Sequence, residues 1–232
     1  MRCKAILAVL LLVGLGFLMS VPARATLTGT LNIMGEVHLD ATHLDWLPLG
    51  GGAGFIINGF SSTGSFTAIP GFALGRALDL DLAVTPVGVP LALSAYMLLP
   101  QPSPIFSFDL NFIFPGATTG PLTLTDTTTG VNLAWGVRTT ATDLRDDSTA
   151  CFIGTYSSQI NGMTAAALLT LLESGGSITS TYSASFNPCP APIPATALLL
   201  LTGLAGLFWQ VARRRHPQYL PAASRSHAHI GK

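Results

Sequence analysis

Between Thr26 and Pro190 the chain alternates apolar and polar residues in steps of two, which is the pattern of a half-buried β-strand. In the segment 78–84, leucine and valine alternate with two aspartates. The segment 106–114 carries four phenylalanines and one leucine at every second position. A period of two places these side chains on one face of a strand, so the pattern predicts a fold built from β-sheet.

Further segments have the composition of short strands and are separated by turns rich in glycine and proline. These segments are 27–37, 54–58, 64–69, 121–127, 131–140, 150–158 and 177–186. The segment 91–99 is compatible with a strand or a helix. Eight or nine short strands, with turns at a spacing of about ten residues, favour an antiparallel β-sandwich.

One segment has the composition of a helix. Residues 165–173 are rich in alanine and leucine, and Thr164 stands where an N-cap is needed. Gly175 and Gly176 follow and provide the left-handed stop that ends many helices. We therefore predict an all-β fold, an antiparallel β-sandwich with one short helix that covers one of its ends.

Charge is unevenly distributed along the chain. All 11 acidic residues lie between Glu36 and Glu173, whereas the segment 26–190 contains only three cations, Arg76, Arg138 and Arg145, and so has a net charge of −8. Binding of nucleic acid or anionic lipid needs clustered lysine or arginine, which this segment lacks. We expect no nucleic-acid partner. No phosphate-binding loop or dinucleotide fingerprint occurs, so we also expect no cofactor.

The N-terminus has the three parts of a secretory signal. Arg2 and Lys4 precede an apolar stretch, and Ala23 and Ala25 fit the small-x-small pattern of a cleavage site. Residues 1–25 are therefore predicted to be a signal peptide, cut after Ala25, that directs the chain to the secretion translocon.

The C-terminal region contains an apolar span followed by arginines. Residues 195–212 are long enough to cross a bilayer core, since they reach roughly 27 Å as a helix. Arg213, Arg214 and Arg215 come next, and each would cost about 2.5 kcal/mol or more at the centre of a membrane helix. We predict a transmembrane helix at 195–212, an arginine stop, and a cytoplasmic tail at 216–232.

A proline motif stands directly before this span and reads Ala191-Pro192-Ile193-Pro194-Ala195. Motif, span and arginines together resemble a PEP-CTERM sorting domain, and more narrowly its variant with the motif Val-Pro-Leu-Pro-Ala. The resemblance implies that residues 188–215 form a sorting segment made of a stalk, a membrane helix and a stop. It also implies that an exosortase, a membrane protease or transpeptidase of bacteria that produce exopolysaccharide, recognises Pro192, Ile193, Pro194 and Ala195.

Residues 26–187 form the predicted exported domain, which has the size of one domain with one core. Its cysteine usage suits an oxidising compartment, because Cys151 and Cys189 are the only cysteines apart from Cys3. The two could form a single disulfide or remain unpaired, since sequence does not place their Cα atoms within bonding range.

Two groups of residues have the chemistry of metal ligands. The first contains His38, Asp40, His43 and Asp45, and the second contains Asp143, Asp146 and Asp147. We interpret the first as a solvated strand end. We interpret the second as an exposed acidic turn, because Arg145 stands among its carboxylates. We therefore predict no metal site.

Catalytic residues are not predicted either. The exported domain holds only two histidines, His38 and His43, and it lacks the Gly-x-Ser-x-Gly elbow. A secreted hydrolase would require these histidines, or pairs of carboxylates, to converge in a cleft. A carbohydrate-binding module would instead require exposed aromatic rings on one face. The candidates for such rings are Trp46, Trp135, Tyr96, Tyr156 and Tyr182, of which we expect Trp135 to lie in the core.

The expected function follows mainly from the two ends of the chain. We expect an exported, non-enzymatic protein of the bacterial cell surface or extracellular matrix, sorted by an exosortase-type system. Its single C-terminal helix would hold it in the inner membrane, with the exported domain outside the cytoplasm, before it reaches the surface. A module that binds the exopolysaccharide is the alternative, and a hydrolase is a third hypothesis.

Overall fold

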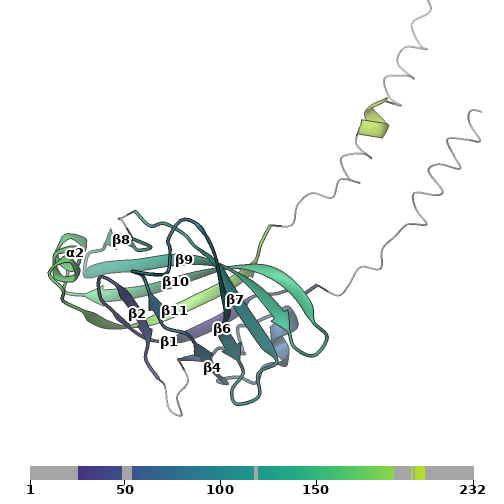
Figure 1. Ribbon diagram of the computed structural model, residues 1–232, viewed down its shortest axis with the longest axis horizontal. Helices are drawn as coiled ribbons and strands as arrows, with labels where there is room; N and C mark the ends of the chain where they lie inside the picture. Colours follow the sequence, from purple (N-terminus) through teal and green to yellow (C-terminus); the bar gives the residue numbers. More distant parts are fainter. Residues whose placement is uncertain (1–25, 49–53, 118–119, 191–199, 201, 207–232) are drawn as a thin grey trace, which may run out of the picture. The chain divides into compact units, whose positions relative to one another are not determined.

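The computed structural model describes residues 26–48, 54–117, 120–190, 200 and 202–206. Strands make up most of the ordered elements (Figure 1). They are β1 (Leu31–Leu39), β2 (His43–Trp46), β3 (Phe55–Ile57), β4 (Leu74–Ala77), β5 (Leu80–Asp81), β6 (Pro90–Leu99), β7 (Phe106–Ile113), β8 (Thr123–Asp126), β9 (Gly130–Asp143), β10 (Ser148–Asn161) and β11 (Ile178–Pro188). The helices are the 3-10 helix η1 (Gly64–Ala68) and the α-helix α2 (Ala165–Glu173).

The sheet closes on itself to form a barrel. Its strands follow one another in the order β11-β10-β9-β7-β6-β4-β3-β1, and β1 also pairs with β11. Eight strands therefore form a ring in which every neighbouring pair is antiparallel. The strands β2, β5 and β8 add to this ring at its edges.

The prediction of a mostly β fold with one short helix is confirmed. The expected two-sheet sandwich is instead a single closed barrel, because the first and last strands pair with each other over their length. Their register runs from Leu31 opposite Phe186 to Leu39 opposite Ile178. Closure satisfies the backbone groups that would otherwise be exposed along two sheet edges.

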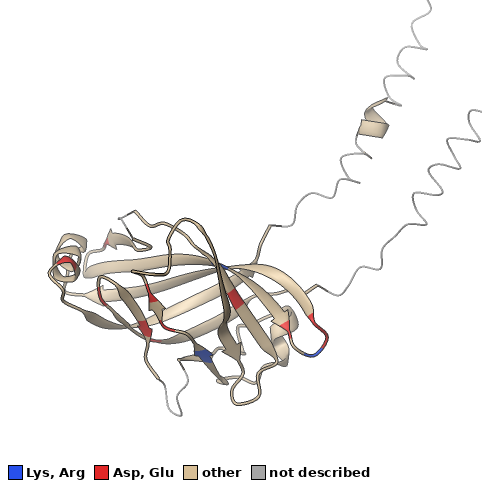
Figure 2. Ribbon diagram, viewed as in Figure 1, with Lys and Arg blue, Asp and Glu red and all other residues tan. Residues whose placement is uncertain are grey.

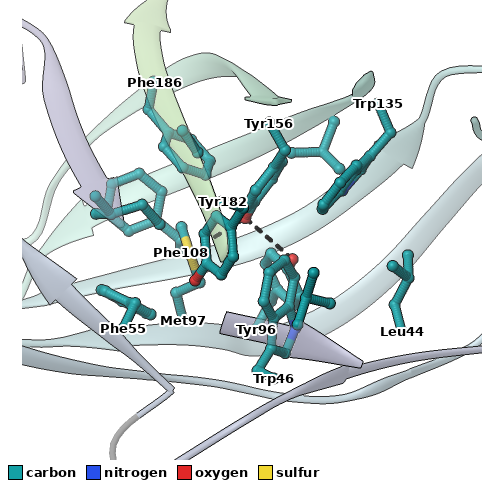
Figure 3. Packing of buried hydrophobic residues seen from close by; sticks show 14 of the residues in the cluster. Leu44, Trp46, Phe55, Tyr96, Met97, Phe108, Trp135, Tyr156, Tyr182 and Phe186 are labelled. Carbon is teal, nitrogen blue, oxygen red and sulfur yellow. Dashed lines mark hydrogen bonds between the residues drawn. The ribbon is translucent and has the colours of Figure 1, made fainter. Parts of the chain in front are cut away.

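Aromatic rings fill the inside of the barrel. Near one end, five buried phenylalanines have ring centroids 5.1 to 6.0 Å apart, and these are Phe66, Phe106, Phe108, Phe152 and Phe186. A second group continues the column and contains Trp46, Trp135, Tyr156 and Tyr182 (Figure 3). An eight-stranded barrel has an interior just wide enough for side chains, so these rings occupy it.

Buried hydroxyls within this column pair with each other. Tyr96 Oη lies 3.1 Å from Tyr156 Oη, and the Tyr156 hydroxyl also lies 3.7 Å from Met97 Sδ (Figure 3). Burial raises the pKa of both tyrosines, so both hydroxyls stay protonated and able to donate. The indole of Trp46 donates from Nε1 to the Leu78 carbonyl at 2.9 Å.

The two ends of the barrel are covered differently. The helix α2 lies at one end, where Leu168 and Leu172 are buried (Figure 1). Thr164 caps it as predicted, because its hydroxyl accepts a hydrogen bond from the amide of Ala167 at 3.3 Å. At the other end η1 inserts Phe66 among the phenylalanines. The strand that we expected at 64–69 is therefore a helical plug.

Both ends of the described domain emerge beside η1. Thr28 and Thr30 donate backbone hydrogen bonds to Ser65 and Thr63, and the Thr30 hydroxyl bonds Asn187 at 2.9 Å. Directly after the last strand, Cys189 forms a disulfide with Cys151 of β10, with their Cα atoms 5.3 Å apart. The bridge fastens the last residues of the barrel to its wall.

Residues 190–232 form a separate unit, in which Leu200 and residues 202–206 are helical. Among the residues that the structure describes, no helix is both long and apolar enough to span a membrane. Most of the predicted span at 195–212 lies outside the described residues, as do the signal peptide with Ala23 and Ala25 and the arginine stop at Arg213, Arg214 and Arg215. The motif residues Pro192, Ile193, Pro194 and Ala195 also lie outside them.

Two buried hydroxyls provide a test of how the interior is stabilised. The Tyr156 hydroxyl is the partner of Tyr96, whereas Thr139 Oγ1 is buried without a hydrogen-bond partner. Tyr156→Phe should lower the free energy of unfolding by about 1–3 kcal/mol, because it leaves the Tyr96 hydroxyl unpaired. Thr139→Val should leave it unchanged or raise it by up to about 1 kcal/mol.

Urea unfolding of residues 26–189, followed by tryptophan fluorescence, measures both variants against the parent. This fragment retains the ring of strands and the disulfide. Equal losses in the two variants would contradict the assignment of the Tyr96–Tyr156 pair as a stabilising contact.

Candidate functional site

The outer wall of the barrel carries hydroxyl and amide side chains where β1, β9, β10 and β11 lie side by side. Because side chains alternate between the two faces of a strand, the positions between the buried aromatic residues of β10 and β11 point outward. These positions include Thr155, Ser157 and Gln159 on β10 and Thr181, Ser183 and Ser185 on β11. This serine- and threonine-rich wall is hollowed.

The hollow, which we call the outer groove, has a volume of about 770 Å³. It is lined by Met34, Gly35, Glu36, Ile56, Asn132, Ala134, Ser157, Ser158, Gln159, Thr181, Tyr182 and Ser183. A second hollow of about 410 Å³ adjoins it and shares Met34, Ser157 and Ser183 with it. Together the two hollows follow the β1, β11 and β10 strands along the wall.

A glycine lies beneath the groove, with its Cβ position on the inner face of β1. A Cβ atom at Gly35 would lie 2.9 Å from the Tyr182 hydroxyl and 2.9 Å from the Gly54 carbonyl oxygen. Real Cβ atoms essentially never come so close to other atoms, so a larger residue would have to displace the Tyr182 side chain or the backbone at Gly54. Tyr182 itself is buried and donates to the Gly54 carbonyl at 3.4 Å.

The lining is almost uncharged, and it combines hydroxyl and amide groups with a larger share of apolar surface. Glu36 is the single ionisable acid or base among the lining residues apart from the buried Tyr182 phenol, whose pKa burial raises. Ser157 Oγ lies 3.2 Å from Ser183 Oγ, and hydroxyl pairs of this kind can turn to donate to or accept from a ligand. The chemistry suits a neutral ligand that carries both donors and acceptors.

The candidate sugar-stacking rings are not available on the surface. Trp46 is 5% exposed and Trp135 is 3% exposed, and Tyr96, Tyr156 and Tyr182 are also buried. Trp135 stacks on Tyr156 with ring centroids 4.8 Å apart, which confirms its predicted place in the core. Burial of all five rings counts against binding of a sugar by aromatic stacking.

The histidine and aspartate group at the β1–β2 turn forms a turn rather than a ligand cluster. Asp40 Oδ1 accepts hydrogen bonds from the amides of Thr42 and His43, both at 2.7 Å. His38 Nδ1 instead lies 3.0 Å from Thr179 Oγ1 on β11. Within the described part of the chain, no group of three or more histidine, cysteine, aspartate or glutamate residues could hold a metal ion.

The same turn brings a hydroxyl, an imidazole and a carboxylate together. His43 Nδ1 lies 2.8 Å from Thr42 Oγ1 and 3.2 Å from both carboxylate oxygens of Asp40. A catalytic triad uses the two ring nitrogens of its histidine separately, one for the nucleophile and one for the carboxylate. Here both partners contact the same nitrogen, which is not the arrangement that activates a nucleophile.

The acidic turn between β9 and β10 is held by an ion pair. Arg145 Nε donates to Asp143 Oδ1 at 2.8 Å, and its Nη2 contacts the other carboxylate oxygen. These hydrogen bonds from Arg145 lower the pKa of Asp143. Asp146 accepts from the backbone amide of Ser148 at 2.9 Å. Asp143 and Asp146 thus stabilise the hairpin. Asp146 and Asp147 are exposed, as we expected of this turn, whereas Asp143 is buried.

Comparison with protein-family models, with curated proteins and with solved structures finds no match for this chain. The interpretation of the site therefore depends on its geometry and on the sequence.

Sequence reasoning did not find the outer groove. The residues that line it come from β1, β3, β9, β10 and β11, which are brought together only by closure of the barrel. A signal was nevertheless present, because serine and threonine occupy every outward position of β11 from Thr179 to Ser185. Such a run of short hydroxyl side chains on one face leaves room for a ligand.

The Asp40 turn predicts a pH dependence of stability. The amide of Thr42, followed by that of His43, lowers the pKa of Asp40 from 3.8 to about 2. Since the carboxylate is favoured in the folded state, its contribution is complete above pH 3.8 and is lost as the pH falls toward about 2. Asp40→Asn keeps an acceptor oxygen but does not titrate.

The stability advantage of the parent over Asp40→Asn should therefore shrink between pH 3.8 and about 2. Asp40→Ala should lose about 1 kcal/mol at neutral pH, because two backbone amides lose their acceptor. Urea unfolding across this pH range measures both effects. A constant difference between the parent and Asp40→Asn would contradict the charged role of Asp40.

Proposed function

We propose that this chain is an exported, non-enzymatic protein of the bacterial cell surface or matrix, sorted through its C-terminal segment by an exosortase-type enzyme. The observation that carries the proposal is the order of parts at the end of the domain. The barrel ends at a disulfide between Cys151 and Cys189, and the proline motif, the apolar span and three arginines follow directly in the sequence.

The disulfide supports export, because such bridges persist in oxidising compartments outside the cytoplasm. The position of the bridge supports a boundary between the barrel and the sorting segment. Cys189 is the last residue of the compact first unit, and Pro190 begins the second. Only two residues, Pro190 and Ala191, would therefore separate the motif at 192–195 from the last residue of the barrel unit.

The filled interior supports a role without catalysis. Packed aromatic rings fill the interior of the barrel. His38 contacts Thr179, whereas His43 contacts Thr42 and Asp40, so the two histidines have no shared partner among these contacts. The outer groove remains as the surface through which the exported domain would meet a partner.

The sorting motif provides the decisive test of this proposal. Pro192→Ala together with Pro194→Ala should leave the barrel folded and should impair processing, because the prolines keep the approach to the apolar span extended and carry the recognition that the resemblance implies. Pro190→Ala is the matched control, since it changes a proline of the same stretch outside the motif.

The measurement follows precursor mass in membrane fractions of cells with and without the exosortase. In cells that carry the enzyme, accumulation of full-length precursor in the double variant but not in the parent or Pro190→Ala supports the proposal, provided that all three accumulate as precursor in cells without the enzyme. Maturation of the double variant at the parental rate would show that the motif is not a recognition signal and that the tail is an ordinary single-pass anchor.

A second candidate function is that the exported domain holds a neutral polysaccharide in the outer groove. Burial of the tryptophans and tyrosines counts against stacking, but the hydroxyl and amide lining favours a ligand that is itself rich in hydroxyl groups. Asn132 and Gln159 supply the two amide side chains of the lining.

If this function is correct, Asn132→Ala with Gln159→Ala should weaken binding about tenfold, because two hydrogen bonds of about 0.7 kcal/mol each are lost. Asn161→Ala is the control. Asn161 is exposed on β10, the strand that also carries Gln159, but it does not line the groove. Calorimetric titration with dextran, and with alginate as an anionic comparison, measures the effect. Equal binding by all three proteins, or none by the parent, would reject this function.

A further inference from the structure

Two large aromatic side chains are exposed on the loop between β3 and β4. Phe60 is 79% exposed and Phe72 is 63% exposed. The aromatic rings inside the barrel, in contrast, are buried. The two rings pack edge to face with centroids 5.4 Å apart. They therefore present one continuous apolar surface to solvent.

The loop is built to hold this pair outward. Phe72 has a φ of 60°, a left-handed conformation that is strained for a bulky residue. A Cβ at Gly71 would lie 2.7 Å from the Phe60 ring, so only glycine lets that ring lie over the loop. Phe72 also donates its amide to the Ile57 carbonyl at 3.1 Å, which fixes the loop to β3.

The pair lies at the end of the barrel from which the chain leaves toward its apolar segments. The Phe60 loop is tied to β1 by the side-chain amide of Asn32, which donates to the Ser61 carbonyl at 2.7 Å. Two residues farther along, Thr63 accepts the amide of Thr30. Asn187, which directly precedes Pro188 and Cys189, bonds the Thr30 hydroxyl at 2.9 Å.

Charge is absent from the segments around this pair. Residues 26–35, 58–75 and 174–190 contain no aspartate, glutamate, lysine or arginine. The charged residues at this end are Arg76 on β4 and the β9–β10 turn with Asp143 and Arg145 (Figure 2). In the ring of strands, β9 and β10 lie on the side opposite β3 and β4, so that turn is directed away from the aromatic pair.

We propose that Phe60 and Phe72 form a membrane-contact patch that inserts into the interfacial region of the bilayer in which the chain's own apolar span is anchored. The length of chain between barrel and span fits this occupant. Six residues lead from Cys189 to Ala195, and a chain of this length spans at most about 22 Å even when fully extended, which is the upper limit on the distance between Cys189 and the start of the span.

The chemistry also selects lipid. Phenylalanine rings gain by leaving water for an apolar interface and need no anionic headgroup. The net charge of the exported domain is −8, which disfavours an anionic surface, so the expected partner is a zwitterionic one such as phosphatidylcholine. The inference rests on the proposed membrane anchoring, and the test separates the two.

The experiment places the full-length chain, without its signal peptide, in phosphatidylcholine vesicles with and without brominated acyl chains, which quench nearby tryptophan. Trp46 and Trp135 are buried in the barrel, so quenching of the parent protein reports Trp209 in the apolar span. Trp209→Phe removes that signal. Phe60→Trp in the Trp209→Phe background then reports the aromatic pair alone.

Val84→Trp in the same background is the matched control. Val84 is 76% exposed and lies after β5, in the region that packs near α2 at the opposite end of the barrel. Phe60→Trp should lose emission in brominated vesicles, and Val84→Trp should lose none. Addition of Phe72→Ser should reduce the loss at position 60, because the two rings insert together.

Quenching in the parent with none at position 60 would overturn the membrane-contact patch and leave the anchor intact. Absence of quenching in the parent would overturn the anchor instead. If the protein is dimeric in mild detergent and Phe60→Ser makes it monomeric, the pair binds a second copy of this chain, and the membrane-contact patch is likewise overturned.

Discussion

The pairing of the first strand with the last is the interaction on which the rest of the structure depends. β1 and β11 are joined in antiparallel register over the whole of β1, although their residues are about 150 positions apart in the sequence. Without this seam the sheet would have two long exposed edges, which are prone to aggregation. The contact is also highly non-local, and such pairings form slowly because a long loop must close first. The disulfide from Cys151 to Cys189 reinforces the neighbouring β10–β11 pair at the end of the same seam.

Closure in turn determines what the interior must be. A ring of eight strands leaves space for side chains and little else, and aromatic residues fill that space with few polar atoms. The polar atoms that do enter are mostly paired, as in the Tyr96–Tyr156 contact and the Trp46 indole with the Leu78 carbonyl. Within the described residues, the indole nitrogen of Trp135 is a buried exception, although its ring stacks on Tyr156 in nearly parallel planes. The stacking offsets part of the cost of an unpaired donor.

Sequence alone predicted the strands better than their arrangement. The alternation along 106–114 and 131–140 marks real strands because one face of each packs on the interior. The strand predicted at 64–69 was wrong, because this segment forms the 3-10 helix η1, which buries Phe66 in the end of the barrel. Along 78–84 only Leu80 and Asp81 pair, because Asp79 instead accepts the backbone amide of Trp46 at 2.8 Å. A period of two shows which face is buried, but a sandwich and a barrel bury the same face. The pattern therefore could not reveal closure, nor the outer groove that closure creates.

The outer groove lies on the outer face of β1 and β11, the two strands whose pairing closes the barrel. Met34 lies opposite Ser183 and Glu36 opposite Thr181 in the β1–β11 register, and all four line the groove. Between them Gly35 lies opposite Tyr182, whose ring belongs to the interior column. A change at Gly35 would thus alter the groove floor and the packing of the rings together, because one backbone position separates the two. Because packed side chains fill the interior of this barrel, a ligand would have to bind outside that interior, and the outer groove lies on the wall where β1 and β11 close the ring.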